Sequence, residues 1–171
     1  EHMKDPQVVS TRSDESEVRT AERVKQCLYY VEGTKKISLL MGILKTQIKA
    51  GEEDGGRTMI FVNTKRMGEK LECWLVGNDL KCGYLSGDVP QNKRMKVLEA
   101  FQKGEMPILI ATDVAGRGLH IDGVTHVINY DMPEDSHDYV HRIGRTARAG
   151  EEGDAITFVD ETGAYDLEAV E

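Results

Sequence analysis

The residues best suited to chemistry by type and spacing lie in the segment HRIGRTAR, residues 141–148. Arg145 and Arg148 are three positions apart, so a helical turn would place both guanidinium groups on one face. Two planar guanidinium groups suit a polyphosphate, because each can make paired hydrogen bonds to phosphoryl oxygens. Gly144 has no side chain and would let a ligand approach the turn closely. The alternative is a surface helix end whose arginines pair with the acids of residues 134–138.

Two further segments could bind phosphate groups. The segment ATDVAGRGLH, residues 111–120, has small residues and two glycines after an apolar run, so its backbone N–H groups could face an anion. Thr112 adds a hydroxyl donor there. Gln91 and Arg94 share one face at the expected start of a helix, where the helix dipole favours anions. The alternatives are a tight turn in the first segment and a solvated helix start in the second.

The sequence lacks the elements that normally hold a nucleotide. There is no G-x-x-x-x-G-K-[ST] phosphate loop and no acidic DExx box after a strand. Arginine fingers supplied by one domain to ATP held by another would explain arginines without that cradle. The three cysteines form no C-x-x-C pair, which argues against a zinc site or a disulfide framework and for a reducing cytosol. We therefore expect a cytoplasmic protein with no metal ligands of its own.

The net charge of −8 is concentrated at one end of the chain. Residues 151–171 hold eight acids and no Lys or Arg, so residues 1–150 are neutral overall and contain local basic clusters. Such clusters can bind phosphate even in an acidic protein, so a nucleic-acid partner is compatible with the composition. Hydrophobic residues make up 39% and charged residues 30%, which is typical of a soluble globular protein without a membrane-spanning segment.

Short apolar runs alternate with amphipathic stretches along the chain. We expect strands in five segments, residues 24–31, 58–62, 108–111, 124–130 and 155–159. Helical spacing predicts helices over residues 35–48, 66–76 and 91–101. This alternation predicts an α/β domain with an open parallel sheet of five or six strands and helices on both faces. Ligands bind beyond the carboxyl ends of such strands, where polar residues follow the apolar runs at positions 63–65, 112–113 and 131–133.

The domain organisation is expected to be simple. Residues 1–21 are polar and aperiodic, and we interpret them as an expression scar, Glu1-His2-Met3, followed by a linker or tail. Residues 22–171 form one domain in this interpretation.

Four motifs together resemble the C-terminal RecA-like domain of a DEAD-box RNA helicase of superfamily 2. Residues 58–66 (TMIFVNTKR) look like motif IV, residues 91–94 like the QxxR motif, residues 111–121 like motif V and residues 141–148 like motif VI. The resemblance covers residues 22–168 approximately. Within the family the chain is most similar to the bacterial helicase of the RNA degradosome, because of Gly118-Leu119-His120 and the segment VPQNKR at residues 89–94.

The resemblance implies roles for individual residues. It implies contacts with the RNA sugar-phosphate backbone for Asn63, Lys65, Arg66, Gly87, Arg94 and Thr112. It implies that Arg145 and Arg148 are catalytic and reach the γ-phosphate of ATP, and that His120 lies at the ATP ribose. Coupling between the two domains is implied for Gln91, Arg117 and His141. Two positions depart from the family, which usually has Ala at Gly116 and, at His120, an Asp that touches the ribose.

The resemblance implies that the chain is half of an enzyme. The whole protein would be an ATP-dependent RNA helicase that unwinds short duplexes locally, and this half alone is predicted to be inactive. ATP and Mg²⁺ would be held mainly by an N-terminal DEAD domain, which is a partner in cis. The other implied partners are RNA and a degradosome-type ribonuclease scaffold. The alternatives are half of a superfamily 2 DNA translocase, or a non-catalytic protein-docking module that uses the acidic face of residues 151–171.

Overall fold

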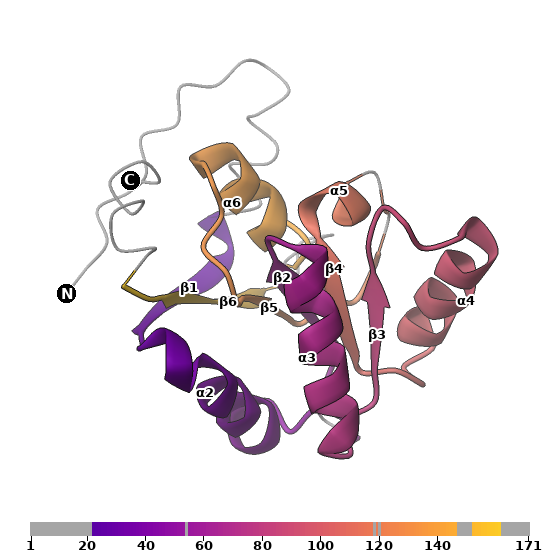
Figure 1. The fold of residues 1–171 in the computed structure, drawn as a ribbon, viewed down its shortest axis with the longest axis horizontal. Coiled ribbons are helices and arrows are strands. Elements are labelled where there is room, and N and C mark those ends of the chain that lie inside the picture. The colour runs from indigo at the N-terminus through magenta and orange to yellow at the C-terminus, as the bar shows by residue number, and fades with distance from the viewer. Residues whose placement is uncertain (1–21, 54, 118, 120, 147–151, 162–171) are drawn as a thin grey trace.

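The computed structural model describes residues 22–53, 55–117, 119, 121–146 and 152–161. These residues build a six-stranded sheet in which every paired neighbour is parallel. The spatial order is β1 (Val24–Tyr30), β6 (Gly153–Val159), β5 (His126–Asn129), β2 (Thr58–Val62), β4 (Ile108–Thr112) and β3 (Cys82–Leu85). Because all six strands run the same way, their carboxyl ends meet at one edge of the sheet (Figure 1).

Strands β2 and β4 are buried at every position. β2 and β4 pair along their whole length, and all ten of their residues are buried. Unbroken apolar runs of this kind can exist only where helices cover both faces of the sheet. β1 lies at the edge of the sheet, and its pattern is correspondingly more exposed.

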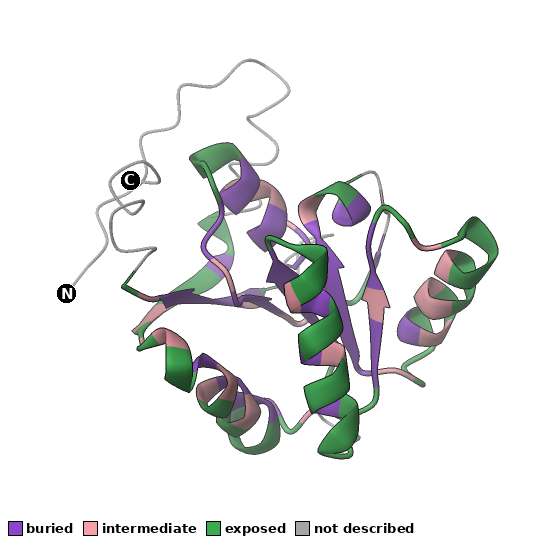
Figure 2. Ribbon diagram, in the orientation of Figure 1, coloured by how far each residue is buried: buried purple, intermediate pink, exposed green. Residues whose placement is uncertain are grey.

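Helices cover each face of the sheet (Figures 1 and 2). On one face, side chains of α2 (Lys36–Gly42), the π-helical segment η2 (Ile43–Gln47) and α3 (Lys65–Gly77) pack on the strands. On the other face, the packing elements are α4 (Gln91–Gln102), α5 (Asp113–Gly116) and α6 (Ser136–Ile143). A short 3₁₀ turn, η1 (Gly33–Lys35), precedes α2. Purple, buried positions in Figure 2 follow the strands and the inward sides of these helices.

The structure confirms the predicted α/β architecture and refines some element boundaries. The predicted helix over residues 35–48 is divided into η1, α2 and η2. The sixth strand, β3, is short and follows a turn, and the apolar pattern did not locate it. Residues 1–21 and 162–171 lie outside the described residues. In the part of the chain that is described, no helix is long and apolar enough to cross a membrane.

The opposite, amino-terminal edge of the sheet holds a histidine that should make stability depend on pH. Burial lowers the pKa of His126, and the nearby Asp154 carboxylate, 3.6 Å away, opposes this shift. The unfolded chain therefore binds a proton more readily at this residue, so stability falls as pH drops through about 6.5 and is regained above it. We expect the loss of stability between pH 8 and pH 5.5, measured by urea unfolding, to be smaller in His126→Gln.

Equal pH dependence in His126→Gln and the parent chain would show that His126 is protonated equally in the folded and unfolded states.

Candidate functional site

The carboxyl edge of the sheet is organised around Arg142, whose side chain is 1% exposed. Its Nε and Nη2 atoms donate to the two carboxylate oxygens of Asp113, each at 2.7 Å. Nη1 donates to the backbone carbonyl of Asp131 at 2.7 Å, and Nη2 also donates to Oδ1 of Asn63 at 2.5 Å. One guanidinium group from α6 therefore connects the three segments that follow β2, β4 and β5. A planar group with five fixed donors can make this set of contacts, whereas an ammonium group cannot.

A buried lysine extends the same network toward β1 and β6. Nζ of Lys36 lies 3.1 Å from carboxylate oxygens of both Asp131 and Asp160. The other carboxylate oxygen of Asp131 accepts the backbone N–H of Asn63 at 2.9 Å. Lys36 also lies over the ring of Tyr130, 4.6 Å from its centroid. Burial, with the two carboxylates adding to it, raises the pKa of Tyr130 to about 12, so the ring stays neutral beneath the ammonium group.

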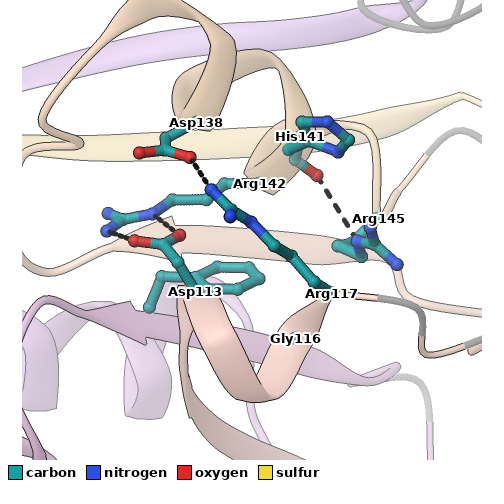
Figure 3. A pocket seen from close by; sticks show the side chains of 8 residues that line it. Asp113, Gly116, Arg117, Asp138, His141, Arg142 and Arg145 are labelled. Atoms are coloured by element: carbon teal, nitrogen blue, oxygen red, sulfur yellow. Dashed lines mark hydrogen bonds and ion pairs between the residues drawn. The ribbon is translucent and has the colours of Figure 1, made fainter.

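A pocket beside Arg142 is lined by three arginines and a histidine (Figure 3). Besides Arg142, these are Arg117, which follows α5, and His141 and Arg145, which belong to the arginine-rich segment. Nη2 of Arg117 pairs with Asp138 at 2.7 Å, and that hydrogen bond raises the pKa of the guanidinium further. The pocket is therefore rich in planar donors, with Asp113 and Asp138 balancing part of the charge.

Arg145 lies beyond the end of α6, and its predicted alignment with Arg148 on one face falls outside the described residues. α6 ends at Ile143, and Arg145 lies in the following turns, which are closed by hydrogen bonds three residues apart. The hydroxyl of Thr146 donates to the carbonyl of Val124 at 2.6 Å, which directs the chain away from the helix axis toward β5. Arg145 is mostly buried and donates through Nη1 to the carbonyl of Leu119 at 2.7 Å. Arg148 and His120 lie outside the described residues.

The alternative in which Arg145 and Arg148 pair with the acids of residues 134–138 stays open, because Arg148 lies outside the described residues. Arg142 pairs with Asp113 of α5, and the carboxylate of Asp138 accepts a hydrogen bond from Arg117. Asp135 is the N-cap of α6, because its Oδ1 accepts a hydrogen bond from the backbone N–H of Asp138 at 2.8 Å. These contacts join the segment after β4 to α6, which brings residues 113–117 and 138–145 into one site.

A second group of predicted residues gathers where β3, β4 and α4 meet. Nη2 of Arg94 donates to the carbonyl of Ala115 at 2.7 Å, which places the start of α4 beside α5. A methyl group built on the exposed Gly87 would lie 3.8 Å from Val114. Thr112 ends β4 and is buried. Arg94, Gly87 and Thr112 therefore lie around α5.

The remaining predicted residues are placed less uniformly. Lys65 forms an exposed ion pair with Asp88, and Arg66 and Gln91 are exposed at the starts of α3 and α4. The side-chain amide of Asn63 is directed into the protein, because Nδ2 donates to the carbonyl of Met132 at 2.9 Å while Oδ1 accepts from Arg142. Gln91 is not among the residues that line the pocket with Arg117 and His141.

Sequence reasoning missed the residues that hold this edge together. Arg142 lies three positions after Tyr139 and one before Ile143, and both of those side chains are buried. That helical spacing places Arg142 on the inward face, and it could have identified Arg142 as a buried residue. No comparable pattern identifies Lys36, because its two acidic partners stand 95 and 124 positions later in the chain.

Comparison with known proteins places the chain in a family. The family model described as helicase conserved C-terminal domain matches residues 35–150. The chain therefore belongs to this helicase C-terminal family, and the predicted RecA-like, DEAD-box type of domain is confirmed.

Individual relatives agree with that assignment. The chain is 51% identical, over all 171 residues, to the ATP-dependent RNA helicase RhlB of Xanthomonas campestris, of which it spans 28% of the length. The resemblance to a bacterial DEAD-box RNA helicase that the sequence indicates is thus confirmed.

Solved structures share the fold as well. The chain resembles the E. coli DEAD-box protein SrmB, described as bound to regulator of ribonuclease activity A, with a TM-score of 0.76 and 35% identity over 86% of this chain and 84% of that one. S. cerevisiae Dbp5, described as bound to RNA and ADP BeF3, matches with a TM-score of 0.75 and 32% identity over 86% of this chain and 38% of that chain.

Proposed function

We propose that this chain is the C-terminal half of an ATP-dependent RNA helicase. In this proposal Arg145 and Arg148 act as arginine fingers on ATP, which an N-terminal DEAD domain holds with Mg²⁺. The observation that carries it is the pocket in which Arg117, Arg142 and Arg145 meet at the carboxyl edge of a sheet without a phosphate loop of its own. These donors fit ATP, because planar guanidinium groups can make paired hydrogen bonds to phosphoryl oxygens. Bound ATP would supply the phosphoanhydride bond to be cleaved.

The RNA surface proposed here follows the second group of residues. Arg94, Gly87 and Thr112 surround α5 and offer a guanidinium, an unobstructed backbone and a hydroxyl to a sugar-phosphate chain. Lys65 and Arg66 add positive charge at the start of α3. None of these groups needs to contact a base edge, so we propose recognition of the backbone without base preference. Dbp5, described as bound to RNA and ADP BeF3, supports carrying both ligands over to this chain.

Arg94→Ala should weaken RNA binding evenly across sequences. With three or four neutralised phosphates, log K against log salt for a single strand should slope by about −2 to −3, and loss of one contact should flatten this slope by about 0.7. The measurement is fluorescence anisotropy with poly-U, poly-A and mixed oligonucleotides at several salt concentrations. Arg23→Ala, an exposed arginine next to the start of β1 at the opposite edge of the sheet, is the matched control and should leave the slope unchanged. A salt-independent affinity, or strong preference for one base, would contradict backbone recognition.

The alternatives are less well supported. A docking module on the acidic face of residues 151–171 would need free carboxylates, but in the described part of that segment three acids have internal contacts. Asp160 pairs with Lys36, Asp154 lies beside His126, and Glu161 accepts the backbone N–H of Gly33 at 3.1 Å. For the DNA translocase alternative, equal affinity for DNA and RNA strands in the same binding assay would be the favouring result.

The remaining partners are proposed on the strength of the relatives. We propose RNA and an N-terminal DEAD domain in cis as partners, and a degradosome-type ribonuclease scaffold as a third. SrmB, described as bound to a regulator of ribonuclease activity, is an example of such association in a protein of this fold. A cytoplasmic location and a single domain over residues 22–171 are proposed in the same way.

A further inference from the structure

Two histidines stand one turn apart on α6, at the rim of the arginine-lined pocket. His137 and His141 are four positions apart, and their Nε2 atoms lie 3.2 Å from one another. The two rings are nearly perpendicular, with an interplanar angle of 69° and centroids 4.4 Å apart. Both Nε2 atoms therefore lie within one small region beside the helix.

This separation matches the requirement of a transition-metal ion. Tetrahedral coordination with Zn–N bonds of about 2.0–2.1 Å places two ligand nitrogens about 3.3–3.4 Å apart. Without an ion, one imidazole must donate to the other, and this uses a single tautomer of each ring. With an ion between them, both Nε2 lone pairs are satisfied at once.

Acidic groups lie beside His137. Asp135, His137 and Asp138 bring potential ligand atoms within 4.8 Å of one another. Asp138 is already bonded to Arg117, and its position beside the pocket is visible in Figure 3. Asp135 is exposed and uses only Oδ1 to begin the helix, so in the described part of the chain its Oδ2 has no recorded hydrogen bond.

From these contacts we infer that His137 and His141 form a binding site for a divalent transition-metal ion such as Zn²⁺. Water molecules complete the coordination. Imidazole nitrogen suits Zn²⁺, Ni²⁺ and Cu²⁺, whereas Mg²⁺ prefers oxygen ligands and an octahedron, so the site is distinct from any Mg²⁺ carried with ATP. Because α6 packs on the sheet through Tyr139 and Ile143, the backbone that carries the two histidines is held in place before the ion arrives.

Isothermal titration of the 171-residue chain with ZnCl₂ tests this site. We expect one binding event that also raises the melting temperature, with no comparable event for MgCl₂. Loss of an outer-shell partner lowers metal affinity by about 10- to 100-fold at known metal sites. His137→Asn removes a direct ligand, so it should lower Zn²⁺ affinity by more than this. Asp135→Asn keeps a good helix-capping residue and should weaken binding less than loss of either histidine. His2→Asn removes an imidazole elsewhere in the sequence and is the matched control.

The possible results distinguish a metal site from a pair of hydrogen-bonded histidines. Zn²⁺ binding that is lost in His137→Asn and kept in His2→Asn supports the site. No binding event, or one that is unchanged in His137→Asn, shows that the two rings are only hydrogen-bonded, and it overturns the inference.

A second measurement depends on the proposed function. If His141 couples the two domains, Zn²⁺ bound to its Nε2 should slow ATP hydrolysis by the full-length protein. In His137→Asn this inhibition, measured relative to the rate of the same variant without Zn²⁺, should be lost. Binding without inhibition would leave the metal site standing and count against the role of His141. Inhibition that persists in His137→Asn would place the inhibitory ion elsewhere.

Discussion

Arg145→Lys in the full-length protein should remove most RNA-stimulated ATP hydrolysis while leaving RNA binding nearly unchanged. Lysine keeps the positive charge but lacks the planar fork that bonds two phosphoryl oxygens at once. Arginine fingers in other phosphoryl-transfer enzymes contribute about 10³–10⁵ in rate, which sets the largest loss expected here. Arg148→Lys should have a similar effect, since both arginines are proposed to act on the same phosphate. The measurement is steady-state phosphate release with saturating RNA.

The matched control is Arg23→Lys, the same substitution at an exposed arginine beside the start of β1. It should leave the rate unchanged. Because Arg145 also donates to the carbonyl of Leu119, the melting temperature of Arg145→Lys must be compared with that of the parent. A stable Arg145→Lys protein with normal turnover would show that Arg145 only fastens the turn after α6.

Arg142→Ala should destabilise the domain more than any other single arginine substitution in the described part of the chain. Removal of one partner from a buried ion pair typically costs about 3–5 kcal/mol, because the other charge is left without compensation. For a chain of this size each kcal/mol lowers the melting temperature by about 2–4 °C, so a fall of about 6–20 °C is expected. Here the Asp113 carboxylate, the Asp131 carbonyl and the Asn63 amide would all lose a donor.

Arg117→Ala is the matched control for stability. Its side chain is 58% exposed, whereas that of Arg142 is 1% exposed, so the loss should be smaller even though its partner Asp138 is mostly buried. The double variant Arg142→Ala/Asp113→Ala should be less destabilised than the sum of the two single variants. Additive effects of the two substitutions would mean that the Arg142–Asp113 pair contributes little to the folded state.

The sheet was predictable because several of its strands correspond to unbroken apolar runs in the sequence. Residues 58–62 and 108–111 were expected as buried strands, and β2 and β4 are buried at every position. The short β3 was not located, since Cys82-Gly83-Tyr84-Leu85 is too brief to separate from a turn. Its place beside β4 follows from tertiary pairing, which no local pattern encodes.

The site was predictable only in part, for a similar reason. Spacing identified the segments that gather at the carboxyl edge, because parallel strands end there together. It did not show that Arg142 is the arginine buried against Asp113, since that depends on contacts between distant segments. The turn that carries Arg145 off the helix is set by the bond from Thr146 to Val124, 22 positions earlier.

The pairing of β1 with β6 has a consequence for the order in which this sheet can be completed on the ribosome. Among the six strands of the described residues, β1 is synthesised first, yet its neighbour in the sheet, β6, is the last to emerge. At a synthesis rate of about 5–20 residues per second, β6 follows β1 after roughly 6–25 s. The strands β2 to β5 can already assemble during that interval, because all of them emerge before β6. Nascent β1 must therefore wait as an unpaired strand, and it depends on the newly made β6 to join the rest of the domain.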